Sequence, residues 1–296
     1  MSKIIKELKE AIKNTDSKEL EAILLHNPDI NYNTKKSIEV FYQLLDYVYE
    51  PVIEKAKLLL DYGFDVNQKK NSNSYSLLHM AVSYGDPDLV EEIVNRKANI
   101  NERDNKFLRT PLHFSKNSEI TTLLINAGAD LNAKDIQGIS PLLSSLMNPS
   151  VSFPEEEICK QVKLILDAGA DINSTDNYGN TTLLIAISFP LRKCVDLILK
   201  YYPDVNCQND NGHTALSLAI NIGSIDIVRV LIDLGADIDL VNPHDLWSPL
   251  FIATNRGNVR MVEILMEAGA NKNLMDKNGK TPIHYTRNKK IVELLK

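Results

Sequence analysis

The sequence of 296 residues has only one tryptophan and three cysteines. No stretch approaches the ~20 apolar residues that a membrane-spanning helix needs, so we expect no membrane partner. The first ten residues are charged and amphipathic and lack the apolar core of a secretory signal. Cys159, Cys194 and Cys207 form neither an even set nor a closely spaced pair. This predicts no disulfide framework and favours a reducing, cytoplasmic location.

Motifs that carry chemistry are equally scarce. Gly279-Lys280-Thr281 resembles the end of a phosphate-binding loop, but Leu274 occupies the position of the first glycine and no strand precedes it. The calcium-loop pattern fails at its first ligand, and the six histidines have no metal-ligand spacing with cysteine. No nucleophile and base can be paired. We therefore predict that the protein is not an enzyme and that it has no catalytic residues, no metal and no cofactor.

The net charge of −6 is unevenly placed. Residues 204–245 contain seven aspartates and one arginine, whereas residues 272–296 contain seven lysines or arginines against Asp276 and Glu293. The basic end is interpreted as a cap that lysines keep soluble, or alternatively as a docking site for an acidic partner. An acidic chain with few aromatics in its basic segment disfavours nucleic acid as the partner.

What the sequence does contain is a unit of about 33 residues that recurs. Its clearest copy spans 209–239, where a turn at Asn211-Gly212 leads to an N-cap at Thr214 and a first helix that Gly223 ends. In the second helix, 225–234, the polar residues are spaced three and four residues apart, so only one narrow face is expected to contact solvent. Such a helix must be covered on several sides, and therefore needs copies of the unit as neighbours.

Two sequence features recur with the spacing of this repeat. The first helix begins at a Thr or Ser, with intervals of 34, 30, 41, 33, 34 and 33 residues, at Ser76, Thr110, Ser140, Thr181, Thr214, Ser248 and Thr281. The second helix is followed by an exit turn that ends at Asn67, Asn101, Asn132, Asn173, Asn206, Asp239 and Asn273, as in Gly169-Ala-Asp-Ile-Asn173. Two marks with the same spacing define a solenoid.

The segments Ser76-Leu-Leu-His-Met-Ala81, Thr110-Pro-Leu-His-Phe-Ser115 and Thr281-Pro-Ile-His-Tyr-Thr286 resemble ankyrin repeats over nearly the whole chain. The resemblance implies an all-α ankyrin-repeat solenoid of helix pairs joined by β-hairpin or turn fingers, and a function in protein binding without catalysis. The histidine is replaced in four units, where the Thr–His hydrogen bond of the family should be absent; the replacements are Leu143, Leu184, Ser217 and Phe251.

We expect a single ankyrin-repeat domain over 1–296 with about nine units, including both caps. Its predicted parts are degenerate N-terminal units over 1–67, core repeats over 68–273 and a C-terminal cap over 274–296. The first units read as helix pairs, Ile4–Ile12 with Leu20–Leu25 and Ile38–Tyr49 with Val52–Tyr62. An insertion over 148–157 carries two prolines and three glutamates, which we expect to continue neither helix and to form a loop.

In a solenoid the repeated residues build the scaffold, so function should reside where the pattern breaks. The resemblance implies a concave surface made of the finger tips, the residue before each cap and the outer end of the first helix. Large or charged residues at these places are the predicted partner-binding set: Tyr75, Tyr84, Phe107, Arg109, Ile139, Tyr178, Phe189, His213, Ile222, Trp247 and Arg256. Leu246 replaces the usual glycine, which predicts a distorted turn. Trp247 then either projects as an anchor or tilts against Leu246 or Phe251.

The predicted function is therefore a monomeric module that blocks, recruits or tethers a partner protein on its concave surface. An alternative is a bacterial or viral effector delivered into a host cytoplasm, or a toxin-neutralising immunity protein, acting through the same surface. A composition rich in Lys, Asn and Ile is typical of AT-rich genomes and keeps this alternative open. A nucleic-acid-associated module is a third hypothesis, which salt-dependent binding would reveal.

Overall fold

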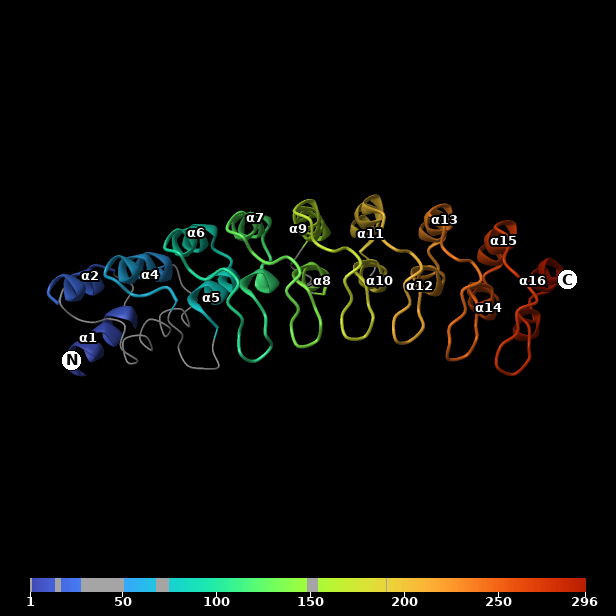
Figure 1. The fold of residues 1–296 in the computed structure, drawn as a ribbon, viewed down its shortest axis with the longest axis horizontal. Coiled ribbons are helices and arrows are strands. Elements are labelled where there is room, and N and C mark those ends of the chain that lie inside the picture. The colour runs from blue at the N-terminus through green and yellow to red at the C-terminus, as the bar shows by residue number, and fades with distance from the viewer. Residues whose placement is uncertain (1, 14–16, 28–50, 68–74, 148–153, 190) are drawn as a thin grey trace. The chain divides into compact units, whose positions relative to one another are not determined.

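The computed structural model describes all residues except 1, 14–16, 28–50, 68–74, 148–153 and 190 (Figure 1). The described residues form helices and turns and no β-strand element. The α-helices are α1 Ser2–Lys13, α2 Ser17–Leu25, α4 Pro51–Asp61, α5 Leu77–Tyr84, α6 Pro87–Asn95, α7 Ser118–Asn126, α8 Pro141–Leu146, α9 Glu155–Asp167, α10 Thr182–Ser188, α11 Arg192–Ile198, α12 Ala215–Ile222, α13 Ile225–Asp233, α14 Pro249–Asn255, α15 Val259–Glu267 and α16 Lys289–Leu295. Three 3-10 helices are η1 Pro111–Phe114, η2 Leu199–Tyr201 and η3 Pro282–Tyr285.

The chain forms two compact units. Unit 1 comprises residues 1–145 and 167–170, and unit 2 comprises residues 146–166 and 171–296. Within unit 1, α5 packs against α6 and η1; within unit 2, α12 packs against α10, α13 and α14. In each repeat of unit 2 the first helix lies beside a finger and the second helix lies away from it (Figure 1). The predicted all-α fold class is confirmed, whereas the single-domain organisation and its boundaries stay predictions.

The repeat at 209–239 forms as its local chemistry predicts. The Thr214 hydroxyl accepts the Ser217 amide at 3.0 Å before α12 begins, and Gly223 ends α12 with a φ of 76°. In α13 the apolar residues Ile227, Val228 and Leu231 are buried. Burying one such side chain contributes roughly 1.5–3 kcal/mol, so packing of the helices against those of neighbouring repeats stabilises the fold.

Asparagines of the exit turns link consecutive repeats. The Asn206 side chain accepts the Asp237 amide at 2.7 Å and donates to the Gly235 carbonyl at 3.1 Å, both in the next exit turn. Asn101 makes the same two bonds with Asp130 and Gly128 in unit 1, at 2.7 and 3.0 Å. Each asparagine thus satisfies backbone groups of the following repeat that no helix pairs.

Histidines in the Thr-x-x-His segments make a second link. The His113 Nδ1 accepts the Thr110 amide at 3.1 Å, and its Nε2 lies 3.0 Å from the Ile139 carbonyl in the next repeat. His79 makes the equivalent bonds with the amide of its cap residue Ser76 and with the Arg109 carbonyl. A backbone N–H can only donate, so Nδ1 carries no proton and Nε2–H is the donor to the carbonyl. The predicted Thr–His bond is confirmed in these repeats, and in the Thr214 repeat the Ser217 hydroxyl accepts the Thr214 amide instead, at 2.9 Å.

This arrangement makes unit 1 sensitive to acid. Burial lowers the pKa of His113 below its ordinary value of 6.5. Below that pH the unfolded chain binds a proton that the folded chain does not, so stability falls as the pH falls below about 6.5, with a maximal slope for one proton of about 1.4 kcal/mol per pH unit. We expect His113→Ser to flatten the dependence of Tm on pH between pH 7.5 and 5.5. An identical slope in the variant would contradict the assignment.

The insertion is shorter than predicted. Glu155, Glu156 and Glu157 form the first turn of α9, so the expectation that these three glutamates cannot join a helix is wrong. Carboxylates are stabilised at a helix N-terminus by the helix dipole, and Pro154 directly precedes the helix. Residues 148–153, and the predicted helix over 38–49, lie outside the described residues.

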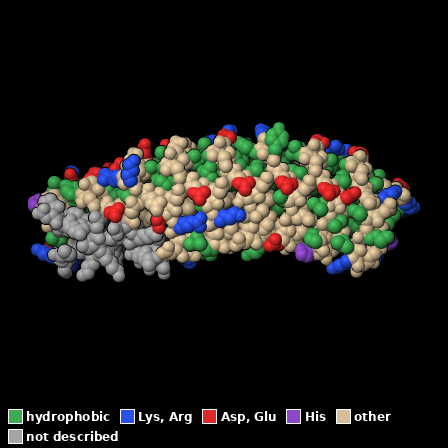
Figure 2. Space-filling model, in the orientation of Figure 1, with side chains coloured by type: hydrophobic (Ala, Val, Ile, Leu, Met, Phe, Trp, Pro, Cys, Tyr) green, Lys and Arg blue, Asp and Glu red, His purple; other side chains and the backbone are tan. Residues whose placement is uncertain are grey.

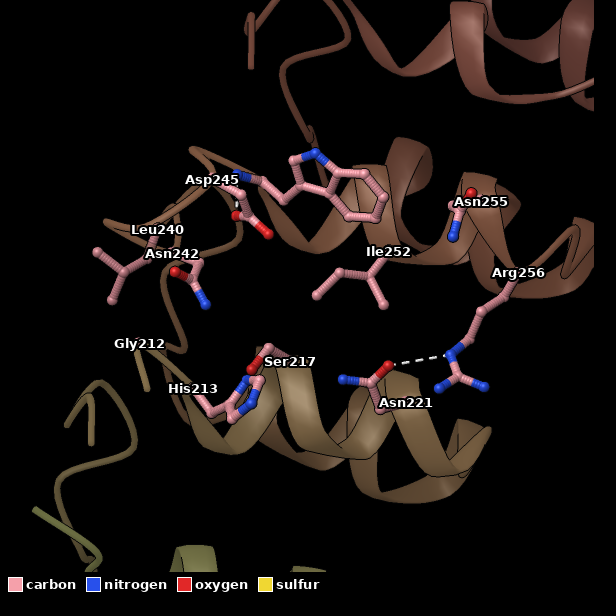
Figure 3. Close-up of a pocket in the computed structure, with 11 residues that line it drawn as sticks. Gly212, His213, Ser217, Asn221, Leu240, Asn242, Asp245, Ile252, Asn255 and Arg256 are labelled. Carbon is pink, nitrogen blue, oxygen red and sulfur yellow. Dashed lines mark hydrogen bonds between the residues drawn. The ribbon is translucent and has the colours of Figure 1, made fainter. Parts of the chain in front are cut away.

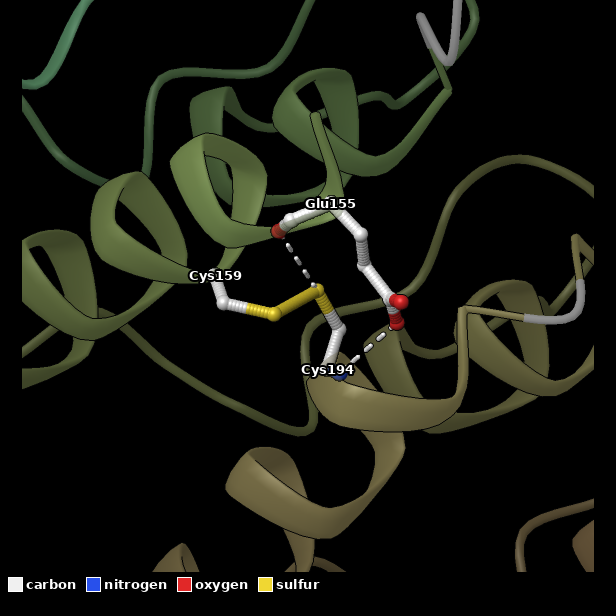
Figure 4. A group of neighbouring side chains, drawn as sticks. All are labelled: Glu155, Cys159 and Cys194. Atoms are coloured by element: carbon white, nitrogen blue, oxygen red, sulfur yellow. Dashed lines mark hydrogen bonds between the residues drawn. A yellow bond between two sulfur atoms is a disulfide. The ribbon is translucent and has the colours of Figure 1, made fainter. Parts of the chain in front are cut away.

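The expected absence of a disulfide is also wrong. Cys159 in α9 and Cys194 in α11 are disulfide-bonded, with their Cα atoms 5.2 Å apart (Figure 4). The two cysteines are 35 residues apart in sequence, which is close to the length of one repeat, so each lies in the second helix of its own repeat. Glu155 joins the same two helices because its carboxylate accepts the Lys193 amide at 2.6 Å, in the first turn of α11. The bond therefore fastens two consecutive second helices of unit 2.

Candidate functional site

The fingers between repeats are built on buried or half-buried Asp and Asn side chains. Asp176 Oδ1, for example, accepts the amides of Tyr178 and Asn180 at 2.9 and 2.8 Å, which folds the tip of its finger. The same role belongs to Asp104, Asp135, Asn209, Asn242 and Asp276. These side chains act as local turn formers, so the finger conformation is fixed before any partner arrives.

Neighbouring fingers contact each other within a unit. The Ile136 amide donates to the Phe107 carbonyl in unit 1, and the Asp210 amide donates to the Tyr178 carbonyl in unit 2, both at 2.9 Å. At Gly212 a Cβ atom would lie 2.6 Å from the side chains of Asn242 and Pro243 in the next finger. Only glycine therefore permits this approach.

Among the described fingers, two are one residue longer than the others and carry a leucine where the others have glycine. Leu108 and Leu246 adopt positive φ angles of 59° and 61° where shorter fingers have glycine. The turn at Leu246 departs from the glycine turn as predicted, through one extra residue and a left-handed leucine, and the finger still closes with the Asn242 amide 2.9 Å from the Trp247 carbonyl. Both leucine side chains are exposed, at 41% and 39%. Leucine in the left-handed region is strained, and strain of this kind concentrates at functional sites.

A groove of about 370 Å³ lies in unit 2 between two consecutive repeats (Figure 3). Fingers close one end of the groove, and the first helices α12 and α14 form its sides. Its apolar lining consists of Leu240, Trp247 and Ile252, and its amide lining of Asn221, Asn242 and Asn255. Ile252 points into the space between the two helices (Figure 3). The groove thus combines an apolar wall with side chains that can both donate and accept hydrogen bonds.

The two ends of the groove have opposite charge. Asp245 lies at the finger end and Arg256 at the far end of α14 (Figure 3). Arg256 Nε donates to Asn221 Oδ1 at 2.9 Å, which joins consecutive repeats and orients the guanidinium. The Asp245 carboxylate accepts the Trp247 amide at 2.9 Å. A ligand lying along the groove would therefore meet a carboxylate first and a guanidinium last.

Trp247 is half-buried. The sequence left open whether it projects as an anchor or packs against Phe251, and in the structure it both lines the groove and contacts Phe251. Its ring stacks on Phe251, with centroids 5.8 Å apart and planes at 18°, and meets the edge of Tyr285 at 5.2 Å. Tyr75 contacts Phe114 of the following 3-10 helix in the same manner, at 5.2 Å. In both cases a short 3-10 helix, η1 or η3, ends in the aromatic residue that supports the ring. Trp247 lines the groove while its ring rests on this support.

The other predicted binding residues fall into three groups. Tyr75, Tyr178, Phe189 and Ile222 are exposed hydrophobic residues, and Arg256 is exposed. Tyr84, Phe107, Arg109 and His213 are half-buried. Ile139 differs, because it is only 7% exposed and packs in the core. The groove brings together His213, Trp247 and Arg256 from the predicted set. Their role in binding stays a prediction.

The sequence analysis missed Leu240, Asn242 and Ile252 as groove residues. Ile252 lies four residues after the cap Ser248, on the finger side of α14, so helical periodicity carried a signal for it. Leu240 directly follows an exit turn, and no local pattern distinguishes it. Asn242 has the same turn-forming role as Asn209, so the sequence pattern marks it as a turn former and not as a groove residue.

A hydrogen bond from the Tyr285 hydroxyl, with others from backbone amides, lowers the pKa of Asp276 from its ordinary 3.8 to about 2. The stabilisation by Asp276 is thus present above about pH 4 and is lost as the pH falls toward 2. Burial, together with Asp204, raises the pKa of Cys207 to about 11. That thiol is therefore protonated and unreactive at neutral pH.

Among the residues that the structure describes, one group of side chains has metal-ligand chemistry. Donor atoms of Glu155, Cys159 and Cys194 lie within 4.8 Å of one another (Figure 4). The two sulfurs are bonded to each other, and a disulfide does not supply the thiolates that bind metals. The arrangement thus fits a covalent link between helices and not a metal site.

The residues described also contain no helix both long and apolar enough to cross a membrane.

The family model for ankyrin repeats (three copies) matches residues 44–135, 155–242 and 235–296. The chain belongs to the ankyrin-repeat family. Ankyrin repeats are generally protein–protein interaction modules, and the fold is typically a scaffold without enzymatic activity. The hydrogen-bonded caps, the fingers and the paired helices described above are the structural form of this family in the present chain.

Similar proteins show how widely the repeat is used. The chain is 34% identical over 95 residues to the human ankyrin repeat and SOCS box protein 6. The aligned segment covers 31% of this chain and 23% of that protein. It is 32% identical over 108 residues to a putative ankyrin repeat protein of fowlpox virus, covering 35% and 25%. The matched segment therefore spans about a quarter of these curated relatives.

Solved structures extend the similarity. The ankyrin repeat domain of Bcl-3 superposes with a TM-score of 0.65 at 24% identity, covering 75% of this chain and 99% of that domain. An ankyrin repeat domain from Acinetobacter baumannii gives a TM-score of 0.58 at 32% identity, covering 66% and 98%. The first of these likenesses supports the fold alone.

Proposed function

We propose that this ankyrin-repeat protein binds an extended segment of a partner protein in the groove of unit 2 and acts by occupying it. The observation that carries the proposal is the groove itself, in which Trp247 forms an apolar wall between Asp245 and Arg256. Trp and Arg are the residues that most often dominate binding energy at protein interfaces.

The chemistry of the lining fits a peptide backbone. Asn255 carries an amide that matches the donors and acceptors of a peptide bond, whereas the Asn242 amide is bonded within the fingers and Asn221 Oδ1 accepts Arg256. The apolar wall suits one large hydrophobic side chain of the ligand. Asp245 and Arg256 would fix the direction of the ligand, because a basic residue fits one end and an acidic residue the other. The apolar wall would thus contribute affinity, and the charges of Asp245 and Arg256 would determine the orientation of the ligand.

Occupancy of this groove could block, recruit or tether the partner, and would equally serve a host-directed effector or a toxin-neutralising protein. We propose that the protein acts as a monomer. Its cytoplasmic location stays a prediction, and the Cys159–Cys194 disulfide removes the cysteine argument on which that prediction depended.

We expect Trp247→Ala to weaken partner binding by about 2 kcal/mol or more, and Arg256→Ala to weaken it by less. Partners captured by the native protein and identified by mass spectrometry would be titrated against each variant. Arg229→Ala is the matched control, because Arg229 is exposed on the second helix α13 and outside the groove. Binding that Arg229→Ala weakens as much as Trp247→Ala does would contradict the groove as the binding site.

A further inference from the structure

Two neighbouring fingers of unit 1 display cations and apolar side chains together. The first finger carries Arg103, Lys106, Phe107, Leu108 and Arg109, and the second carries Ile136; we call these six residues the basic finger patch. Arg103 Nη1 donates to the Lys134 carbonyl of the second finger at 2.8 Å, and the Ile136 amide donates to the Phe107 carbonyl of the first. The two fingers therefore form one fixed surface.

The carboxylates of these fingers are directed inward. Asp104 is 1% exposed and accepts the amides of Lys106 and Phe107 at 2.8 and 2.6 Å. Asp135 is 5% exposed and accepts Arg109 Nε at 3.0 Å. Lysine and arginine side chains consequently lie at the surface while the aspartates are beneath it, and Figure 2 shows Lys and Arg side chains over these two fingers. The exposed charged side chains of these two fingers are therefore those of lysine and arginine, although the finger sequences contain both signs of charge.

Apolar side chains accompany the cations. Leu108 and Ile136 are 41% and 48% exposed, and Leu108 holds a left-handed backbone with a φ of 59°. A glycine would adopt this conformation without strain, as other fingers of the chain show. The packing of the finger does not require a leucine side chain that is exposed to this extent. An exposed aliphatic pair with a cationic rim is the composition of a protein-docking surface.

We propose that the basic finger patch docks an acidic segment of a partner protein, in which Asp or Glu residues alternate with large aliphatic or aromatic side chains. The carboxylates pair with Lys106 and Arg103, and the apolar side chains cover Leu108 and Ile136. The inference rests on the proposed function, because it names the chemistry of a partner bound by this chain. It concerns residues of unit 1, whereas the groove belongs to unit 2.

A nucleic acid fits the patch less well. Single strands are bound by aromatic rings on which bases stack. Lys106 Nζ and the Arg109 guanidinium already lie over the Phe107 ring, 4.7 and 5.2 Å from its centroid. The most exposed apolar side chains of the patch are the aliphatic Leu108 and Ile136, and aliphatic contact selects a protein side chain over a base.

The test uses short synthetic peptides of three compositions, Glu with Leu, Glu with Ser, and Lys with Leu, together with single-stranded DNA. Binding to the full chain would be measured by fluorescence anisotropy. We expect the Glu–Leu peptide to bind at least about tenfold more tightly than the Glu–Ser and Lys–Leu peptides. Equal binding of the Glu–Ser peptide, or tighter binding of DNA, would overturn the proposal.

Two variants localise the site. Lys106→Glu should weaken binding of the Glu–Leu peptide about tenfold, and Leu108→Gly should weaken it about fivefold while preserving the positive φ. Leu246→Gly is the matched control, since Leu246 has the same backbone conformation in a finger of unit 2 that carries Asp245. Circular dichroism would confirm that each variant is folded.

The outcomes separate the two proposals. If the Glu–Leu peptide binds and only Leu246→Gly or Trp247→Ala weakens it, the basic finger patch is not its site, and the proposed groove stands. If the variants of unit 1 weaken the peptide while Trp247→Ala leaves captured partners bound, the patch stands and the groove is not the site. A failure of the Glu–Leu peptide to bind at all overturns the patch alone.

Discussion

Reduction of the disulfide between Cys159 and Cys194 is expected to lower the free energy of unfolding of unit 2 by roughly 3–4 kcal/mol. The bond closes a loop between residues 35 apart in sequence, and a closed loop restricts the unfolded chain more than the folded one. We expect the Cys159→Ser variant to show the same loss. Urea unfolding with and without a dithiol reductant, followed by circular dichroism, would measure both.

The third cysteine supplies the control. Cys207 is outside the disulfide and its thiol is protonated at neutral pH, so Cys207→Ser should change stability by about 0.5 kcal/mol or less. Reductant should have no further effect on Cys159→Ser. If reductant left the native protein unchanged, the disulfide would not contribute to the stability of unit 2.

Phe251→Ala is expected to cost about 3–5 kcal/mol of stability and also to weaken partner binding. Phe251 is fully buried, and its ring forms one aromatic cluster with Trp247 and Tyr285. Removing it would leave a cavity and release the indole from its position in the groove. Thermal unfolding and titration of the captured partner on the same variant would measure the two effects.

Phe251→Leu is the natural control for this experiment. The same slot holds Leu143 and Leu184 in other repeats, and both are buried there. We expect a loss below about 1.5 kcal/mol, because much of the apolar volume is kept. Binding that survives Phe251→Ala in the folded fraction would show that Trp247 needs no aromatic support to reach its ligand.

The fold could be predicted because its determinants are local. A threonine cap, a helix-ending glycine and an exit asparagine each act within a few residues, so their spacing in the sequence is their spacing in the structure. The three glutamates at 155–157 show the limit of this reasoning. Composition alone suggested a loop, but negative charge at the start of α9 favours the helix.

The disulfide and the groove depend on contacts between repeats. Cys159 and Cys194 could have been paired by noticing that their separation of 35 residues nearly equals one repeat. The groove offers no such signal, because its lining comes from two consecutive repeats and no spacing within the sequence marks it. Ile139, like Trp247, directly precedes the cap residue of a first helix and is nevertheless buried. The position in the repeat alone therefore does not determine the exposure of the side chain.

The exit-turn asparagines also bear on how a chain of this kind can change its length. Each asparagine recognises backbone atoms that every repeat presents in the same place, and not a particular neighbour. Excision of residues 174–206 would bring Asn173 to Asp237 in place of Asp204, with the same donor and acceptor atoms available. Insertion or loss of a fraction of a repeat would leave those atoms unmatched. Duplication and deletion during evolution can thus lengthen or shorten such a protein in whole repeats while the joints remain intact.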